Sequence, residues 1–198
     1  MTEHEKLVMR NIIYAVETGG QVYGQKDYAD FTEAYTNSSS EHAITIGAGQ
    51  WYGNEARTLL LNIKSADAAT FKKYDNAGVA SDLTKTDWSN YRISKTSAKA
   101  KAIVKIIDSA VGHRCQDKLV DTQMEAYVKE AAALGVTYID AKMMCANFRH
   151  QGGASAVKRI LAKTAKPYTL DHLYAACQTD TGNQVGAYKS RQKMERLS

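Results

Sequence analysis

A glutamate stands at the end of the first apolar, helix-forming segment, and its position suggests acid catalysis. Apolar residues recur at helical spacing from about Glu3 to Thr18, and Gly19–Gly20 ends the pattern. Glu17 therefore lies in the last helical turn, where the negative end of the helix dipole disfavours a carboxylate. Partial burial favours the protonated form of a carboxyl group, which can then protonate a glycosidic oxygen. Glu17 is thus the candidate catalytic acid.

The run Thr45–Gln50, with the sequence TIGAGQ, is the second segment that could take part in chemistry. Glycoside hydrolysis normally needs a second carboxylate across the scissile bond, to activate water or to stabilise the oxocarbenium-like transition state. Glu41, just upstream of Thr45, is our choice for this carboxylate. The competing candidates are Asp30, Asp27 and Glu33. Thr45 is predicted to orient the attacking water or the second carboxylate by hydrogen bonding.

Aromatic and polar side chains near these residues are suited to sugar binding, because aromatic faces stack on sugar rings. The predicted substrate contacts are Gln50, Tyr52, Tyr23 and His150. His150 belongs to the segment Arg149–Gly153, where glycines at a helix end permit close approach of a ligand. Two alternatives stay open: the aromatic residues could form a small core, and the glycines could be a plain helix stop.

The elements that must position these residues are mainly helical. Only Gln21–Gly53 has strand character, with β-branched residues in Ala43–Ile46, and it predicts a short β-hairpin lobe. The predicted helices after it are Asn54–Lys64, Ala66–Asn76, a short one around Trp88, Ser97–Val111, Cys115–Leu134, Asp140–His150, Ala154–Lys163, Leu170–Gln178 and a last one over 185–198. The expected fold class is α+β, mainly α, with the small hairpin lobe and a larger helical lobe in one catalytic domain spanning 1–198.

Charge and composition limit the partners. The formal net charge is +5, from 26 basic and 21 acidic residues, which suits a polyanion such as nucleic acid or a teichoic-acid-bearing cell wall. No recognition motif accompanies the charge, so a nucleic-acid partner is not expected. The N-terminus lacks the continuous apolar core of a secretory signal, and no segment predicts membrane insertion. A cytoplasmic place of synthesis is expected.

Cysteine and histidine spacing argues against a metal centre. Cys115, Cys145 and Cys177 are an odd number of scattered residues without the close pairs of metal sites or small disulfide frameworks, so reduced, packed thiols are expected. His42 and His150 have no acidic or cysteine partner at ligand spacing. No metal and no organic cofactor are predicted.

These residues resemble the lysozyme-like superfamily of peptidoglycan hydrolases, above all phage endolysins. In phage-type lysozymes a Glu ends the first helix and a TIGxGH run follows in the hairpin; Glu17 and the TIGAGQ run Thr45–Gln50 are similar, with Gln50 at the position of the His. Lytic transglycosylases and goose-type lysozymes also have a Glu followed by Ser or Thr, as in Glu17–Thr18, and a downstream Gln like Gln50. Inverting chitosanases of the same superfamily carry an acid shortly before a Thr, as Glu41 precedes Thr45.

The resemblance covers the first third of the chain and its last helix, where Gly186–Gln192 is similar to the closing helix of these domains. One departure concerns the second carboxylate. The stretch between Glu17 and Thr45 is longer than in phage-type lysozymes, and Ser39 or Ser40 falls near the position of the expected acid.

The resemblance implies an endolysin-type N-acetylmuramidase that cleaves the β-1,4 bond between N-acetylmuramic acid and N-acetylglucosamine in peptidoglycan. It implies accumulation in the cytoplasm of an infected bacterial host and action on the cell wall after release. The alternatives are a lytic transglycosylase that uses Glu17 alone, a chitosanase-like specificity, and a basic helical nucleic-acid-binding or phage structural protein without enzymatic activity.

Overall fold

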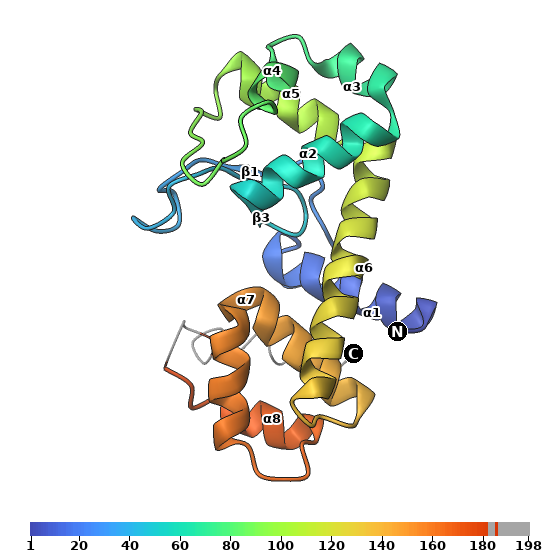
Figure 1. Ribbon diagram of the computed structural model, residues 1–198, viewed down its shortest axis with the longest axis vertical. Helices are drawn as coiled ribbons and strands as arrows, with labels where there is room; N and C mark the ends of the chain where they lie inside the picture. The colour runs from blue at the N-terminus through green and yellow to red at the C-terminus, as the bar shows by residue number, and fades with distance from the viewer. Residues whose placement is uncertain (182–184, 186–198) are drawn as a thin grey trace. The chain divides into compact units, whose positions relative to one another are not determined.

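The computed structural model describes residues 1–181 and 185, and most of them are helical (Figure 1). The predicted α+β, mainly helical class is confirmed. The helices are α1 (Glu3–Glu17), α2 (Asn54–Ala66), α3 (Ala68–Tyr74), α4 (Val79–Asp82), α5 (Ala98–Ile107), α6 (Ala110–Ala133), α7 (Ile139–Lys163) and α8 (Leu170–Cys177). The strands are β1 (Phe31–Thr32), β2 (Thr45–Ile46) and β3 (Trp51–Tyr52). None of the helices in the described part is long and apolar enough to cross a membrane.

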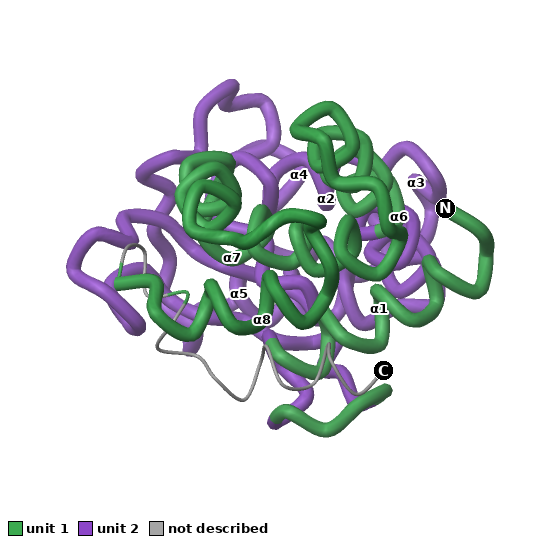
Figure 2. The backbone as a smooth tube through the Cα atoms, turned by 90° about the horizontal axis from the view of Figure 1, so that it is seen from below, with its two compact units in different colours: residues 1–16, 21–24, 121–198 green, residues 17–20, 25–120 purple. Residues whose placement is uncertain are grey.

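Two compact units make up the chain, and each combines segments that are distant in sequence (Figure 2). Unit 1 comprises residues 1–16, 21–24 and the chain from 121 onward, and unit 2 comprises residues 17–20 and 25–120. One boundary falls between the last two residues of α1, and another falls inside α6. The prediction of one catalytic domain over 1–198 stays a prediction.

Unit 2 contains the strands, which form an antiparallel sheet in the order β1-β2-β3. Thr45 lies in the central strand and pairs with Thr32 of β1 and with Tyr52 of β3. The tight turn between β2 and β3 is closed by a 3.0 Å hydrogen bond from the Gln50 N–H to the Gly47 carbonyl. The lobe predicted as a hairpin therefore has a third short strand.

The helices of unit 2 bury a core of large apolar side chains. Helix α2 packs against β3, α3 and α5. The fully or almost fully buried residues of this core include Ile44, Ile46, Trp51, Leu59, Leu60, Ile63, Phe71, Trp88, Ile103 and Ile106. Burying one such side chain contributes about 1.5–3 kcal/mol relative to leaving it exposed. The core thus gives the sheet a rigid support.

The short helix predicted around Trp88 is wrong. The helix in this region is α4, and Trp88 lies in the loop after it, where its indole N–H donates to the Asp82 carbonyl at 3.1 Å. Asp is a common helix N-cap residue, but Asp87 accepts a 2.8 Å hydrogen bond from the Ser89 N–H in a local turn. Asp and Asn side chains serve both kinds of motif, and the sequence around Trp88 does not separate them.

The break between α5 and α6 also differs from the prediction, which placed it after Val111. Helix α5 ends at Ile107, and α6 is already helical at Gly112. The Ser109 hydroxyl accepts a 3.1 Å hydrogen bond from the Gly112 N–H, which caps the new helix. A Cβ atom on Gly112 would lie 2.3 Å from the Ile107 carbonyl oxygen, so this glycine permits the close approach of two helix ends.

Helices are the regular secondary structure of unit 1 in its described part, and short non-helical segments connect them. Helices α7 and α8 pack against each other around a core that includes Met144, Phe148, Ile160, Leu161 and Leu173. Gly153 interrupts α7 with φ 76° and ψ 178°, which confirms the predicted end of one helix at Gly152–Gly153 and the start of another at Ala154. The predicted closing helix over 185–198 lies outside the described residues except for Val185.

Candidate functional site

The end of α1 is joined to the TIGAGQ run through the residue after Glu17. Glu17 is the last residue of α1 and is half-buried. The Thr18 hydroxyl donates to the Ala48 carbonyl at 3.2 Å and accepts from the Asp27 N–H at 3.0 Å. The first bond fixes the chain directly after Glu17 to the turn between β2 and β3, and the second fixes it to the segment before β1. Glu17, Thr18, Asp27 and Ala48 all belong to unit 2.

The two glycines of this run are required by packing. Gly47 has a φ of 75°, and a Cβ atom there would lie 2.5 Å from Oε1 of Gln116. A Cβ atom on Gly49 would lie 2.8 Å from the ring of Trp51, which is completely buried. Only glycine fits both positions without displacing its neighbours, so the turn has one compact conformation.

Gln116 of α6 holds this turn from the inside, and the sequence did not identify it as part of the site. Its side chain is completely buried. Oε1 accepts from the Ala48 N–H at 2.9 Å, and Nε2 donates to the carbonyls of Tyr28 and Ile107 at 3.1 and 3.0 Å. The signal that could have found it is helical spacing, because Gln116 precedes buried Val120 by four residues on the same face.

Thr45 is a polar residue of the central strand β2. It is buried, with 6% of its surface exposed, and its side chain forms no hydrogen bond with another described residue. The predicted role of Thr45 in orienting the attacking water or the second carboxylate stays a prediction.

Asp30 is the carboxylate most closely integrated with the TIGAGQ run. Its Oδ2 accepts from Gln50 Nε2 at 2.6 Å and from the Thr32 hydroxyl at 3.3 Å, and its carbonyl accepts from the Gly47 N–H at 2.8 Å. Burial raises the pKa of Asp30 above its ordinary value, the Gln50 hydrogen bond opposes this, and the charge of Asp27 adds to it. A carboxylate with a raised pKa is a stronger general base.

Asp30→Asn is expected to raise the melting temperature relative to the wild type at pH 7 but not at pH 3. Because the folded-state pKa of Asp30 lies above its ordinary value of 3.8, stability is lost as the pH rises from 3.8 through the folded pKa. Asparagine keeps an acceptor for Gln50 and does not ionise. Calorimetry of both proteins at the two pH values measures the difference, with Asp140→Asn, at an exposed aspartate of unit 1, as control. A variant that is relatively less stable at pH 7 would contradict the role of burial.

The other candidate carboxylates lie in different settings. Glu33 accepts from the Lys95 N–H and from the Ser94 hydroxyl, and the Lys95 hydrogen bond lowers its pKa. Asp27 is exposed. Glu41 is half-buried, and its carbonyl accepts from the Tyr35 N–H at 2.7 Å. Glu33 thus stabilises the loop that contains Ser94 and Lys95. The assignment of Glu41 as a catalytic residue stays a prediction.

The predicted substrate residues divide between the units. Gln50 and Tyr52 belong to unit 2 with Glu17, Glu41 and Thr45, whereas Tyr23 and His150 belong to unit 1. Their predicted substrate contacts stay predictions.

Gln50 and Tyr52 each have a structural role. The Gln50 amide nitrogen is bonded to Asp30, so this residue orients a carboxylate. The Tyr52 hydroxyl accepts from the His42 N–H at 2.8 Å. Both side chains therefore fix the geometry of the sheet around Thr45.

No group of three or more His, Cys, Asp or Glu side chains that could hold a metal ion is found among the described residues. The three cysteines form no disulfide. Comparison of the chain with family models, with curated proteins and with solved structures finds no match in any of the three.

Proposed function

We propose that this chain is a lysozyme-like peptidoglycan hydrolase, an endolysin-type N-acetylmuramidase. The observation that carries the proposal is the hydrogen bond from Thr18 to Ala48, which joins the helix end bearing Glu17 to the turn of the sheet bearing Thr45. An acid at a helix end beside a small sheet with a buried threonine suits the protonation of a glycosidic oxygen. The order of one helix, a small antiparallel sheet and several helices supports the lysozyme-like assignment.

In the proposed reaction, Glu17 donates its proton to the oxygen that links N-acetylmuramic acid to N-acetylglucosamine. The bond from the muramic anomeric carbon to that oxygen breaks, and a water molecule held by Thr45 attacks the carbon. The second carboxylate accepts the proton of this water. Asp30 is the best supported choice for it, because Gln50 orients its carboxylate and burial raises its pKa.

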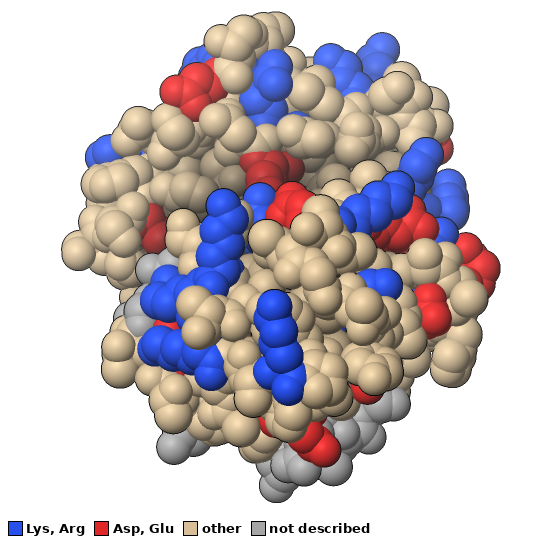
Figure 3. Space-filling model, turned by 60° about the horizontal axis from the view of Figure 1, so that its bottom comes forward, with Lys and Arg blue, Asp and Glu red and all other residues tan. Residues whose placement is uncertain are grey.

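The proposal extends to the cellular setting. The enzyme would accumulate in the cytoplasm of an infected bacterium and act on peptidoglycan strands after release. Figure 3 shows Lys and Arg interspersed with Asp and Glu on the face it draws, in small groups rather than one continuous patch. On this face no continuous basic strip offers the closely spaced phosphate contacts on which nucleic-acid binding depends.

Digestion of purified Gram-positive cell walls tests the proposal. The released muropeptides are expected to carry reducing N-acetylmuramic acid ends, which gain mass on borohydride reduction and are identified by mass spectrometry. Anhydromuramic ends would reassign the chain as a lytic transglycosylase, in which the muramic hydroxyl replaces water. Absence of any release would contradict both chemistries and favour a non-enzymatic binding protein.

A further inference from the structure

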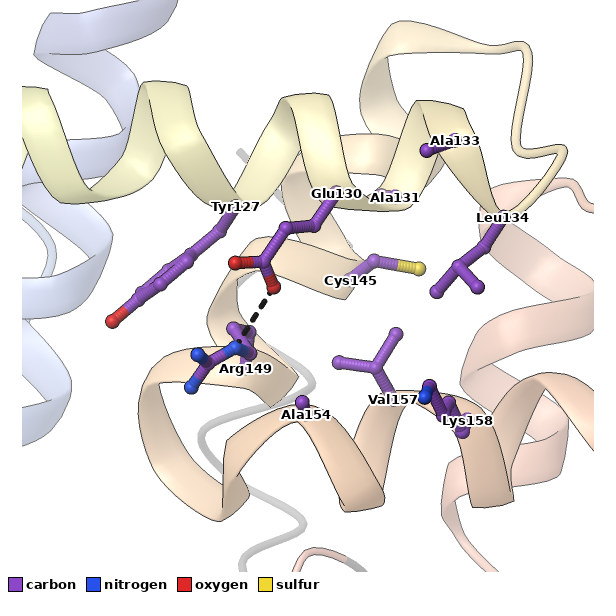
Figure 4. A pocket seen from close by; sticks show the side chains of 10 residues that line it. All are labelled: Tyr127, Glu130, Ala131, Ala133, Leu134, Cys145, Arg149, Ala154, Val157 and Lys158. Atoms are coloured by element: carbon purple, nitrogen blue, oxygen red, sulfur yellow. Dashed lines mark hydrogen bonds and ion pairs between the residues drawn. The ribbon is translucent and has the colours of Figure 1, made fainter.

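Unit 1 has a pocket of its own, formed by the second half of α6 and both parts of α7 (Figure 4). Its volume is about 330 Å³, at the lower end of the range for small-molecule sites. The lining is mostly apolar, with Ala131, Leu134, Cys145, Ala154 and Val157 among its residues. Neither the proposed reaction nor any residue predicted from the sequence uses this pocket.

The interruption at Gly153 builds the pocket. Cys145 precedes it and Val157 follows it, so the two lining residues come from different parts of α7. The φ of 76° and ψ of 178° at Gly153 fall in a region that is essentially restricted to glycine. A straight helix could not bring both parts against the same stretch of α6. The pocket is therefore a consequence of a specific backbone feature.

The two cationic side chains that line the pocket, Arg149 and Lys158, differ in their partners. Arg149 donates to Glu130 at 2.9 Å and lies over the Tyr127 ring at 4.7 Å, so its charge is compensated. Lys158 is exposed and forms no ion pair with the described residues. Figure 4 draws the Arg149–Glu130 pair toward one side and Lys158 toward the other. The pocket thus combines an apolar lining with one uncompensated cation.

We infer that this pocket binds an aliphatic carboxylate of medium chain length. The hydrocarbon chain would contact Leu134, Val157 and the alanines, and the carboxylate would pair with Lys158. A peptide is a poorer match, since buried amide groups need hydrogen-bond partners and the lining offers few polar groups. The inference is independent of the proposed hydrolase activity.

Titration of the isotopically labelled full chain with octanoate, followed by NMR, tests this inference. Saturable shifts are expected for backbone amides of 127–134 and 145–158, and octanol, which lacks the charge, is expected to bind about threefold more weakly. Lys158→Gln should abolish this difference. Lys129→Gln, which removes an exposed lysine of the same unit outside the pocket, should preserve it.

Ala154→Leu tests whether the ligand occupies the pocket itself. Ala154 is exposed at the lining, so a leucine there can fill the space without disturbing the core. Binding of both probes is expected to fall at least tenfold. Absence of saturable shifts with the wild type, equal binding of octanoate and octanol, or unchanged binding by Ala154→Leu would each overturn the inference.

Discussion

Glu17→Gln is expected to lower the rate of muropeptide release by about 10²- to 10⁴-fold, the range for loss of a general acid. Glutamine has nearly the same shape but cannot donate an acidic proton to the leaving oxygen. The substitution also removes a negative charge from the last turn of α1, where the helix dipole disfavours it. Initial rates on purified walls measure the loss, and calorimetry establishes that the variant is folded.

A matched control for this loss lies in the same helix. Glu3 stands in the first turn of α1, and its side chain is 85% exposed, so Glu3→Gln should leave the rate unchanged. If Glu17→Gln keeps most of the activity while the wild type digests walls, then another acid protonates the leaving group. A loss shared by Glu3→Gln would point to an effect on α1 rather than on chemistry.

The second carboxylate is assigned by comparing Asp30→Asn with Glu41→Gln. In a muramidase that uses Asp30 as base, Asp30→Asn loses activity and Glu41→Gln retains it. The reverse result would restore the choice made from the sequence. A transglycosylase, which needs only Glu17, would tolerate both substitutions.

The sequence was informative where a local pattern determines the structure. The apolar repeat before Gly19 predicted α1 to within one residue of its end at Glu17. The break at Gly152–Gly153 was likewise identified, because glycines are strong helix terminators. The structure places Gly153 at φ 76° and ψ 178°, a conformation that favours glycine. Both features depend on residues that are neighbours in the chain.

Long-range hydrogen bonds were the main limit of prediction from sequence. Asp30 is hydrogen-bonded to Gln50, 20 residues away in the sequence, and Gln116 is hydrogen-bonded to Ala48, 68 residues away. The Asn54 side chain accepts from the Trp88 N–H at 2.7 Å, and Gly53 rather than Asn54 occupies the cap position of α2. Polar residues with several possible partners are resolved only by the tertiary fold.

Gln116→Leu is expected to lower the free energy of unfolding by about 3 kcal/mol and the melting temperature by about 6–12 °C. Leucine fills similar space but leaves the buried Ala48 N–H without its acceptor and removes the donor to two carbonyls. Asn62→Leu, which replaces an exposed amide of α2, controls for the general effect of such a change. Calorimetry of both variants measures the difference.

The wall-digesting activity of Gln116→Leu distinguishes a local role of Gln116 in the turn from a general loss of stability. The Ala48 residue that accepts from Thr18 also donates to Gln116, so release of the Ala48 N–H loosens the turn that positions the chain beside Glu17. At 25 °C, where the variant is still folded, wall digestion should fall by about tenfold or more, because displacements near 1 Å reduce catalysis strongly. A destabilised Gln116→Leu protein with full activity would show that the turn keeps its geometry without this side chain. The Thr18–Ala48 bond alone would then position Glu17.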